Sequence, residues 1–183
     1  MPLATAASTG SLLRRRAFQR TGVLRPLLIW LVVAAALAAK PPPAASSGSV
    51  ELAPDSFRLN ALALLNDERA ALGVPPLEEN GELDDVAVER ALDMAAGGYF
   101  AHVSPSGGSA EQLLSLHGVG FGRMGENITR SNEPSNQVVH VAHQAQMMSP
   151  PHRDNMLDAR FNRVGIGVAQ VDGTYYFAVV FAD

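Results

Sequence analysis

The sequence predicts an α+β domain in which helices enclose a small antiparallel sheet. Two observations carry this prediction. Apolar residues recur at helical spacing in several segments between residues 54 and 148. Near the C-terminus, apolar and small residues alternate over residues 164–168, and a second apolar run, residues 175–181, follows the turn pair Asp172-Gly173. This hairpin is the clearest strand signal, so the sheet is expected to be built around it. Gly165 and Gly167 further indicate that another element packs closely against its first strand.

The first 39 residues have the composition of an export signal. Five arginines precede the first acidic residue, Glu51, and residues 26–39 carry no charge. This run of fourteen residues is short for a membrane span, which needs roughly 20. We therefore expect a signal that is cut near Ala38, and Arg15-Arg16 also fits a twin-arginine signal. An uncleaved anchor formed by residues 23–39 is the alternative, and either way the domain is expected outside the cytoplasm, secreted or anchored.

A linker and two helices are predicted next. Residues 40–53 are rich in Pro, Ala, Ser and Gly and are expected to form a flexible linker, so the predicted domain spans residues 54–183. Asp55 is a candidate N-cap for a first helix that ends at Gly73. A second helix is predicted over roughly residues 82–96, with Arg90 among the residues of its inner face. The pair Tyr99-Phe100 that follows is expected to add apolar area to the core.

The middle of the chain predicts two more helices and a strand. Residues 109–112 form a capping box that opens a short helix, and His117 in its last turn would complement the helix dipole. Residues 119–129 predict a strand. A further helix is expected from Pro134 or Asn136 to the double proline at residues 150–151, because proline lacks an N–H and restricts the residue before it. The expected inner stripe of this helix is Val138, Val141, Ala142, Ala145 and Met148.

Charge and cysteine content exclude some classes of function. From Lys40 onward the chain has nine basic and 18 acidic residues, a balance of −9. Nucleic acid is therefore not an expected partner, and membrane contact is expected only through the N-terminal segment. The chain contains no cysteine, so a metal would need His, Asp or Glu as ligands. We expect a monomer.

Three short polar patches interrupt the apolar pattern. They are His102 beside Ser104, Glu126 beside Asn127, and His152 after the two prolines. Two imidazoles and one carboxylate are a sufficient set for a divalent ion, with water completing the coordination. Alternatively the patches are local backbone caps, in which Ser104 satisfies a turn and Asn127 braces a strand end. The residues by themselves leave both interpretations open.

Four segments around these patches resemble a known family. They are AHVSP at residues 101–105, GENI at 125–128, SPPHRDNML at 149–157 and FNRVGIGV at 161–168. The segments are similar to the CAP superfamily of cysteine-rich secretory, antigen-five and pathogenesis-related proteins, and most of all to its bacterial branch without disulfides. The resemblance covers about residues 57–183 in order, and it implies an α-β-α sandwich.

The resemblance also implies a central cleft lined by two His and two Glu, which in some members binds zinc through the histidines. His102, Glu126 and His152 match three of these four residues. The fourth, a Glu on the helix before the second His, has no counterpart, because residues 134–153 contain no Asp or Glu. Gln146, His143 or water would fill its place. The alternative for His143 and its neighbour His140 is a solvated helix face, which we expect for both.

These observations lead to three hypotheses. The first is an extracytoplasmic binding module for a lipid or cell-envelope ligand. Its cleft would comprise His102, Glu126, His152, Ser104 and Asn127, with zinc on His102 and His152. The second is a zinc-dependent peptide or ester hydrolase with Glu126 as general base. Catalytic zinc usually has three protein ligands, so Glu126 as base would leave the metal weakly held, which ranks binding above catalysis. The third is a non-catalytic polar network.

Overall fold

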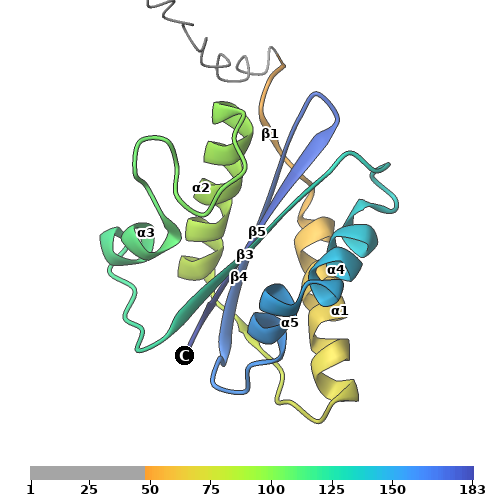
Figure 1. The fold of residues 1–183 in the computed structure, drawn as a ribbon, viewed down its shortest axis with the longest axis vertical. Helices are drawn as coiled ribbons and strands as arrows, with labels where there is room; N and C mark the ends of the chain where they lie inside the picture. Colours follow the sequence, from red (N-terminus) through yellow and green to blue (C-terminus); the bar gives the residue numbers. More distant parts are fainter. Residues whose placement is uncertain (1–47) are drawn as a thin grey trace, which may run out of the picture. The chain divides into compact units, whose positions relative to one another are not determined.

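The computed structural model describes residues 48–183, so the predicted export signal and most of the predicted linker lie outside the described residues. The centre of the fold is a five-stranded sheet in the order β1-β4-β5-β3, with β2 beside β4 (Figure 1). All pairings are antiparallel except that of β2 with β4. The strands are β1 Glu51–Leu52, β2 Glu78–Glu79, β3 Met124–Ser131, β4 Arg163–Val171 and β5 Thr174–Ala182.

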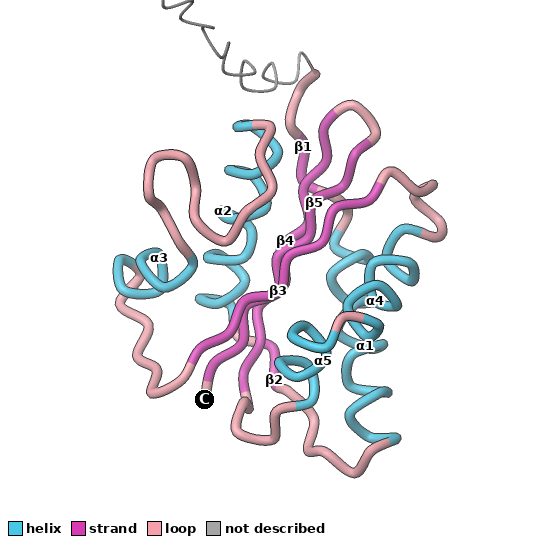
Figure 2. Tube along the Cα trace, in the orientation of Figure 1, coloured by secondary structure: helices cyan, strands magenta, loops and turns pink. Residues whose placement is uncertain are grey.

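Helices cover both faces of this sheet, which confirms the predicted α-β-α sandwich. Helices α2 and α3 lie on one face, and α1, α4 and α5 lie on the other (Figures 1 and 2). Each face buries its own apolar cluster. The helices are α1 Asp55–Ala71, α2 Gly81–Gly97, α3 Ala110–Leu116, α4 Val138–Met148 and α5 Pro150–Leu157. None of the helices within residues 48–183 has the length and apolarity that a membrane span requires.

The C-terminal hairpin forms as predicted. Asp172 and Gly173 both have positive φ, at 48° and 74°, which is the backbone of the two-residue turn that matches strand twist. The close approach predicted at the glycines of β4 is also present. A Cβ on Gly165 would lie 2.0 Å from the backbone carbon of Leu83, and one on Gly167 would lie 2.2 Å from that of Ala87. Helix α2 therefore packs directly onto the backbone of β4.

Several predicted boundaries need correction. The predicted linker ends earlier than residue 53, because Glu51–Leu52 pairs with β4 as a short strand. Pro54, not Asp55, occupies the N-cap of α1, and Asp55 lies in the first turn. The middle strand begins at Met124, not at residue 119. Phe100 is 43% exposed and does not enter the core.

Helix α4 presents a different face to the core from the predicted one. It begins at Val138 because residues 134–137 form a preceding turn closed by the Pro134 carbonyl. Met148 is 84% exposed, whereas two polar residues of the helix, His143 and Gln146, are buried. The prolines end α4 as expected and then occupy the first positions of α5, where a missing N–H costs nothing.

Candidate binding cleft

His102 and Glu126 meet at one side of the sheet. Glu126 lies on β3, and His102 lies in the loop that follows α2. The Nδ1 atom of His102 is 2.7 Å from Oε2 of Glu126. The Glu126 side chain is only 6% exposed, whereas the His102 side chain is 56% exposed. The carboxylate is thus an internal support, and the imidazole is the part of the pair that faces solvent.

A buried arginine holds Glu126 from behind. Arg90 of α2 is 1% exposed and donates from Nε to Oε1 of Glu126 at 2.9 Å. Its other nitrogens donate to the Tyr99 hydroxyl and to the Ala101 carbonyl, which ties the loop before His102 to α2. In the tautomer that complements this carboxylate, His102 donates to Glu126 Oε2 from Nδ1–H. The Nε2 atom of His102 then carries the lone pair.

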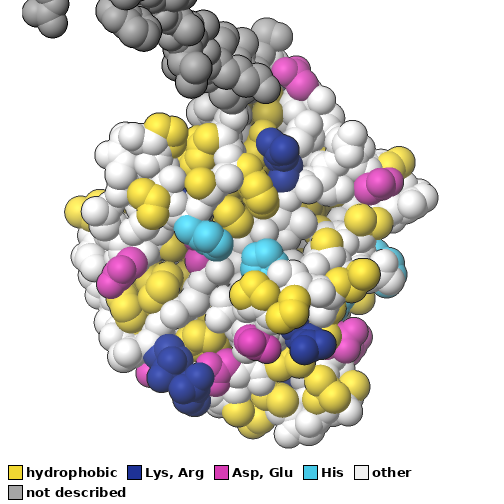
Figure 3. Space-filling view, in the orientation of Figure 1, with side chains coloured by type: hydrophobic (Ala, Val, Ile, Leu, Met, Phe, Trp, Pro, Cys, Tyr) yellow, Lys and Arg dark blue, Asp and Glu magenta, His cyan; other side chains and the backbone are white. Residues whose placement is uncertain are grey.

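His152 lies in the first turn of α5, close enough to His102 for the two to interact electrically. Burial lowers the pKa of His152, and the positive charge that His102 can carry lowers it further. Figure 3 shows two histidine side chains near one another at the centre of one face. A neutral imidazole is the form that ligates a metal ion. The two histidines that the sequence singled out thus influence one another electrostatically, and their joint role in a site stays a prediction.

Asn127 fixes the position of α5, and it does so from inside the protein. The side chain is fully buried and donates to the His152 carbonyl at 2.9 Å and to Gln146 at 3.2 Å. Its own carbonyl oxygen accepts from Asn155 at 2.9 Å. The sequence-based hypothesis placed Asn127 in the lining of the cleft. The buried side chain instead holds the turn that carries His152.

The comparison with known sequences decides the family. The sequence profile of the cysteine-rich secretory protein (CAP) family matches residues 62–182. The chain belongs to the CAP family. It is 31% identical over 121 residues to YkwD, an uncharacterised protein of Bacillus subtilis, an alignment that spans 64% of this chain and 46% of that protein. The chain thus spans less than half the length of that curated relative.

Solved structures share the CAP fold. An outer surface protein of Borrelia burgdorferi is 20% identical, with a TM-score of 0.65 over 74% of this chain and 98% of that one. An extracellular protein of Bacillus anthracis that contains an SCP domain is 29% identical, with a TM-score of 0.59 over 72% of this chain and 44% of that one. The likeness to the Borrelia burgdorferi protein shows the fold alone, and the Bacillus anthracis protein is described as extracellular.

Gln146 of α4 belongs to the polar network around Asn127. It is buried and donates to the Thr129 hydroxyl at 2.9 Å while it accepts from Asn127. Gln146 was one of the three candidates that the sequence left for the place of the missing second Glu, and that assignment stays a prediction.

Ser104 also has a structural role in this CAP domain. Its hydroxyl accepts from the Gly108 amide at 2.8 Å and lies 2.8 Å from the Ser106 hydroxyl, and the residue is buried. These bonds close the loop that carries His102. Ser104 is therefore a turn brace, as the alternative interpretation held, and it offers no free nucleophile to the cleft.

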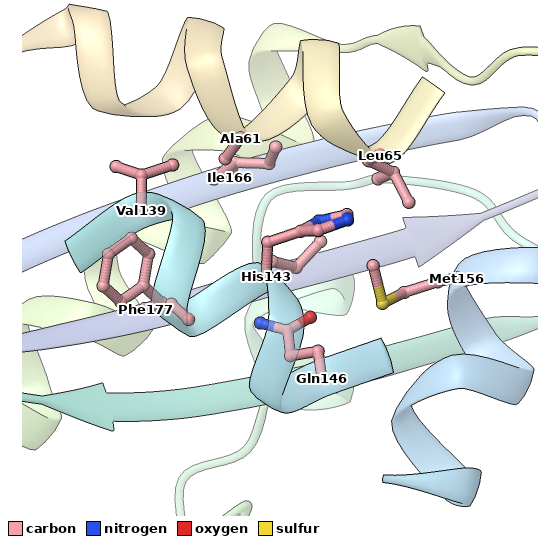
Figure 4. Close-up of a pocket in the computed structure, with 10 residues that line it drawn as sticks. Ala61, Leu65, Val139, His143, Gln146, Met156, Ile166 and Phe177 are labelled. Carbon is pink, nitrogen blue, oxygen red and sulfur yellow. The ribbon is translucent and has the colours of Figure 1, made fainter. Parts of the chain in front are cut away.

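We expected both His143 and His140 to lie on a solvated helix face. His140 is exposed as expected, but His143 is buried, so the expectation was wrong for His143. Figure 4 shows His143 in a cavity of about 20 Å³ between α1, α4 and the sheet. Among the described residues its Nε2 atom has no hydrogen-bond partner, and the nearest charge is Glu68 Oε1 at 3.7 Å. The cavity lies in the interior behind α4, so His143 does not replace the missing cleft Glu.

Fewer side chains are free to coordinate a metal than the three polar patches of the sequence suggested. Within residues 48–183, no three His, Asp or Glu side chains are grouped so that they could hold a metal ion. Glu126 is not a third ligand, since both of its oxygens are engaged by Arg90 and His102. What remains at the surface is a pair of imidazoles. The residue that sequence reasoning missed is Arg90, although a charged residue on the inner face of a helix was a visible signal.

Proposed function

We propose that this CAP protein is an extracytoplasmic binding module, and that the cleft between His102 and His152 binds a divalent ion, zinc by preference, together with a ligand of the cell envelope. The extracytoplasmic location rests on the basic and apolar residues 1–39 and on the extracellular relative of Bacillus anthracis. The binding role rests on the orientation of His102, which is the observation that carries the proposal.

The orientation of His102 suits a metal ligand. Metal-binding histidines usually donate their second ring nitrogen to a carboxylate, which fixes the tautomer and raises the basicity of the ligating nitrogen. Glu126 has this place behind His102, and Arg90 donates to the other oxygen of the same carboxylate. The Nε2 lone pair of an exposed side chain is thus available to an ion.

Two imidazoles fit zinc but do not complete its coordination. Structural zinc sites are closed by four protein ligands, whereas sites that must accept a further molecule keep positions open. A zinc ion on His102 and His152 would present its open positions to an oxygen ligand. We expect weak binding of the metal alone, since only two protein ligands contribute.

The margin of the cleft suits an amphipathic ligand. Phe100 and Val103, which lie near His102 in the chain, are 43% and 56% exposed. Exposed apolar side chains next to a polar centre are typical of binding surfaces. This margin would accept the apolar part of a lipid or of another envelope component, as the sequence-based hypothesis requires.

The geometry argues against Glu126 as a general base. A base needs a free lone pair within reach of a water or substrate. The Glu126 oxygens accept from Arg90 and His102, and the side chain is 6% exposed. The Ser104 hydroxyl is committed to its own loop. A binding role therefore accounts for this arrangement better than hydrolysis does.

Zinc should raise the melting temperature of the full chain, and a chelator should reverse the rise. Binding only to the folded state stabilises it by RT ln(1 + [Zn]/Kd), so free zinc at about tenfold above its Kd should add roughly 1.4 kcal/mol, or a few degrees. The double variant His102→Ala, His152→Ala should lose this rise. The matched control is His117→Ala, which removes a histidine that is paired with Glu89 outside the cleft and should keep it. If zinc leaves the melting temperature of the parent protein unchanged, the proposed metal site is refuted.

A further inference from the structure

Strand β3 forms one edge of the sheet, and the hairpin fixes which of its backbone groups face outward. A two-residue turn joins Val171 and Thr174, so these residues form a hydrogen-bonded pair. Even-numbered residues of β5 therefore bond to β4, and odd-numbered ones face β3. The register sets odd residues of β5 opposite odd residues of β3, as in Phe181 with Gly125. The N–H and C=O groups of the even-numbered residues of β3 thus point away from the sheet.

Other bonds agree with this assignment. The amide of Asp183 donates to the carbonyl of Arg123, which continues the odd-numbered pairing beyond the strand. On the opposite edge, the even-numbered Val164 and Val168 accept from residues outside the hairpin. Four residues of β3 therefore direct backbone groups outward, and no described residue forms a hydrogen bond with those groups. They are Met124, Glu126, Ile128 and Arg130.

The two edges of the sheet differ in how far other residues cover their backbone groups. On the β4 side, β1 and β2 cover the backbone, and Asp84 accepts from the Ile166 amide. On the β3 side, Glu126 retains solvent exposure although its side chain is only 6% exposed, so its exposed surface belongs largely to its backbone. No described strand pairs with the outward edge of β3, although Ile128 near its middle is only 5% exposed, and an edge without a partner strand is a template for pairing with another chain.

This edge lies in the same cleft as the histidines. Side chains of β3 alternate, so Glu126 bonds to His102 on the α2 side and Asn127 bonds to the His152 turn on the α5 side. The edge therefore runs between the segments that carry the two histidines. Its exposed charge is basic, because Arg130 is exposed and lies over the Phe100 ring, whereas the one acidic side chain of β3, Glu126, is buried against Arg90.

We propose that the outward edge of β3 binds an extended, acidic peptide segment of another protein as an additional strand. The proposal rests on the proposed function of the cleft and names a class of partner for it. A strand is the structure that supplies donors and acceptors at the spacing of alternate β3 residues. Its side chains would point alternately toward His102 and toward His152, and its carboxylates would pair with Arg130.

The test uses proline at outward positions, with alanine as the matched control. Proline removes the N–H and fixes φ, and at an edge position that N–H makes no bond within the sheet. Arg130→Pro and Arg130→Ala both remove the side chain, and Met124→Pro and Met124→Ala form a second pair. The full chain is screened against random eight-residue peptides, the length of β3, that are enriched in Asp and Glu. Selected peptides should bind each proline variant about fivefold more weakly than its alanine partner, the effect of one lost backbone hydrogen bond.

Hydrogen exchange gives a second readout, since bound peptide should protect the amides of the four even-numbered residues. Failure to select any peptide, or equal binding to the proline and alanine variants, would overturn the proposal. Self-association of the protein that Arg130→Pro abolishes would also overturn the proposal, because the strand bound at the β3 edge would then belong to a second copy of this chain. The zinc-dependent rise in melting temperature is measured separately. Arg130→Pro should retain this rise, and the His102→Ala, His152→Ala double variant should lose it. Loss of peptide binding and loss of metal binding can therefore be told apart.

Discussion

At the scale of single residues, the sequence identified two histidines and a glutamate but not the arginine that supports them. His102, Glu126 and His152 stand out because each is a titratable residue in a polar patch. Arg90 lies within the apolar stripe of α2, where the periodicity marks it only as core. A buried guanidinium needs charged or carbonyl partners, and Arg69 illustrates the same rule by bonding to main-chain carbonyls. The identity of such partners depends on the fold and could not be read from spacing.

Replacing Arg90 tests whether it supports the cleft. Arg90→Met should leave the Glu126 carboxylate buried without its counter-charge, at a cost of about 3–5 kcal/mol in the free energy of unfolding. Urea denaturation measures this cost. Adding Glu126→Gln should recover part of the loss, because the buried charge is gone. The double variant should still respond poorly to zinc, since the charged acceptor behind His102 is missing. An Arg90→Met protein with wild-type stability would contradict this account of the cleft.

At the scale of elements, type and order were predictable, but the buried face of α4 was not. The strong periodicity of α2 and the Asp172-Gly173 turn specify local structure that tertiary contacts then preserve. Helix α4 has apolar residues on more than one face, so its amino acids permit several orientations. The one observed buries His143 and Gln146 because Gln146 completes the polar network around Asn127. That preference arises from β3 and is invisible in the helix itself.

The packing of α2 on β4 gives a prediction about glycine. Gly165→Ala would place a Cβ 2.0 Å from the backbone carbon of Leu83, so α2 must move away from the sheet. Overpacking of this kind costs typically 1–3 kcal/mol, and collision with backbone places it at about 3 kcal/mol or above. Gly81→Ala on the same helix, with nothing within 4 Å of its Cβ, should be neutral or slightly stabilising. A Gly165→Ala protein that melts at the same temperature as Gly81→Ala, or higher, would show that the close approach is unimportant.

At the scale of the whole domain, the proposed cleft lies where two layers meet at one sheet edge. His102 is tied to the α2 layer through Glu126 and Arg90, and His152 is tied to the other layer through Asn127. Consecutive residues of β3 make these two links because side chains of a strand alternate between faces. The sequence shows the pair Glu126-Asn127 but not which layer each residue would contact. Convergence of segments 50 residues apart, from His102 to His152, required the topology.

Stability of the whole domain should fall as the pH drops below neutrality, and buried histidines should cause part of this fall. Burial lowers the pKa of His143 below 6.5, although the nearby Glu68 opposes the shift and His140 adds to it. The pKa of His152 is lowered as well. A histidine with a lowered folded pKa is protonated more readily in the unfolded state. Its stabilisation is therefore complete above about pH 6.5 and is lost as the pH falls toward the folded pKa.

The contribution of His143 can be separated from that of the carboxylates because the two act in different pH windows. Asp158, whose pKa falls from 3.8 to about 2 through its bond with Arg160, loses its stabilisation only below about pH 4. Urea titrations between about pH 7 and 4.5 should show a slope of at most about 1.4 kcal/mol per pH unit for each histidine. His143→Leu should flatten this slope, since leucine fits an apolar cavity and cannot bind a proton, whereas the exposed His140→Leu should leave the slope unchanged. An unchanged slope in His143→Leu would show that the buried imidazole does not govern the acid limit of this fold.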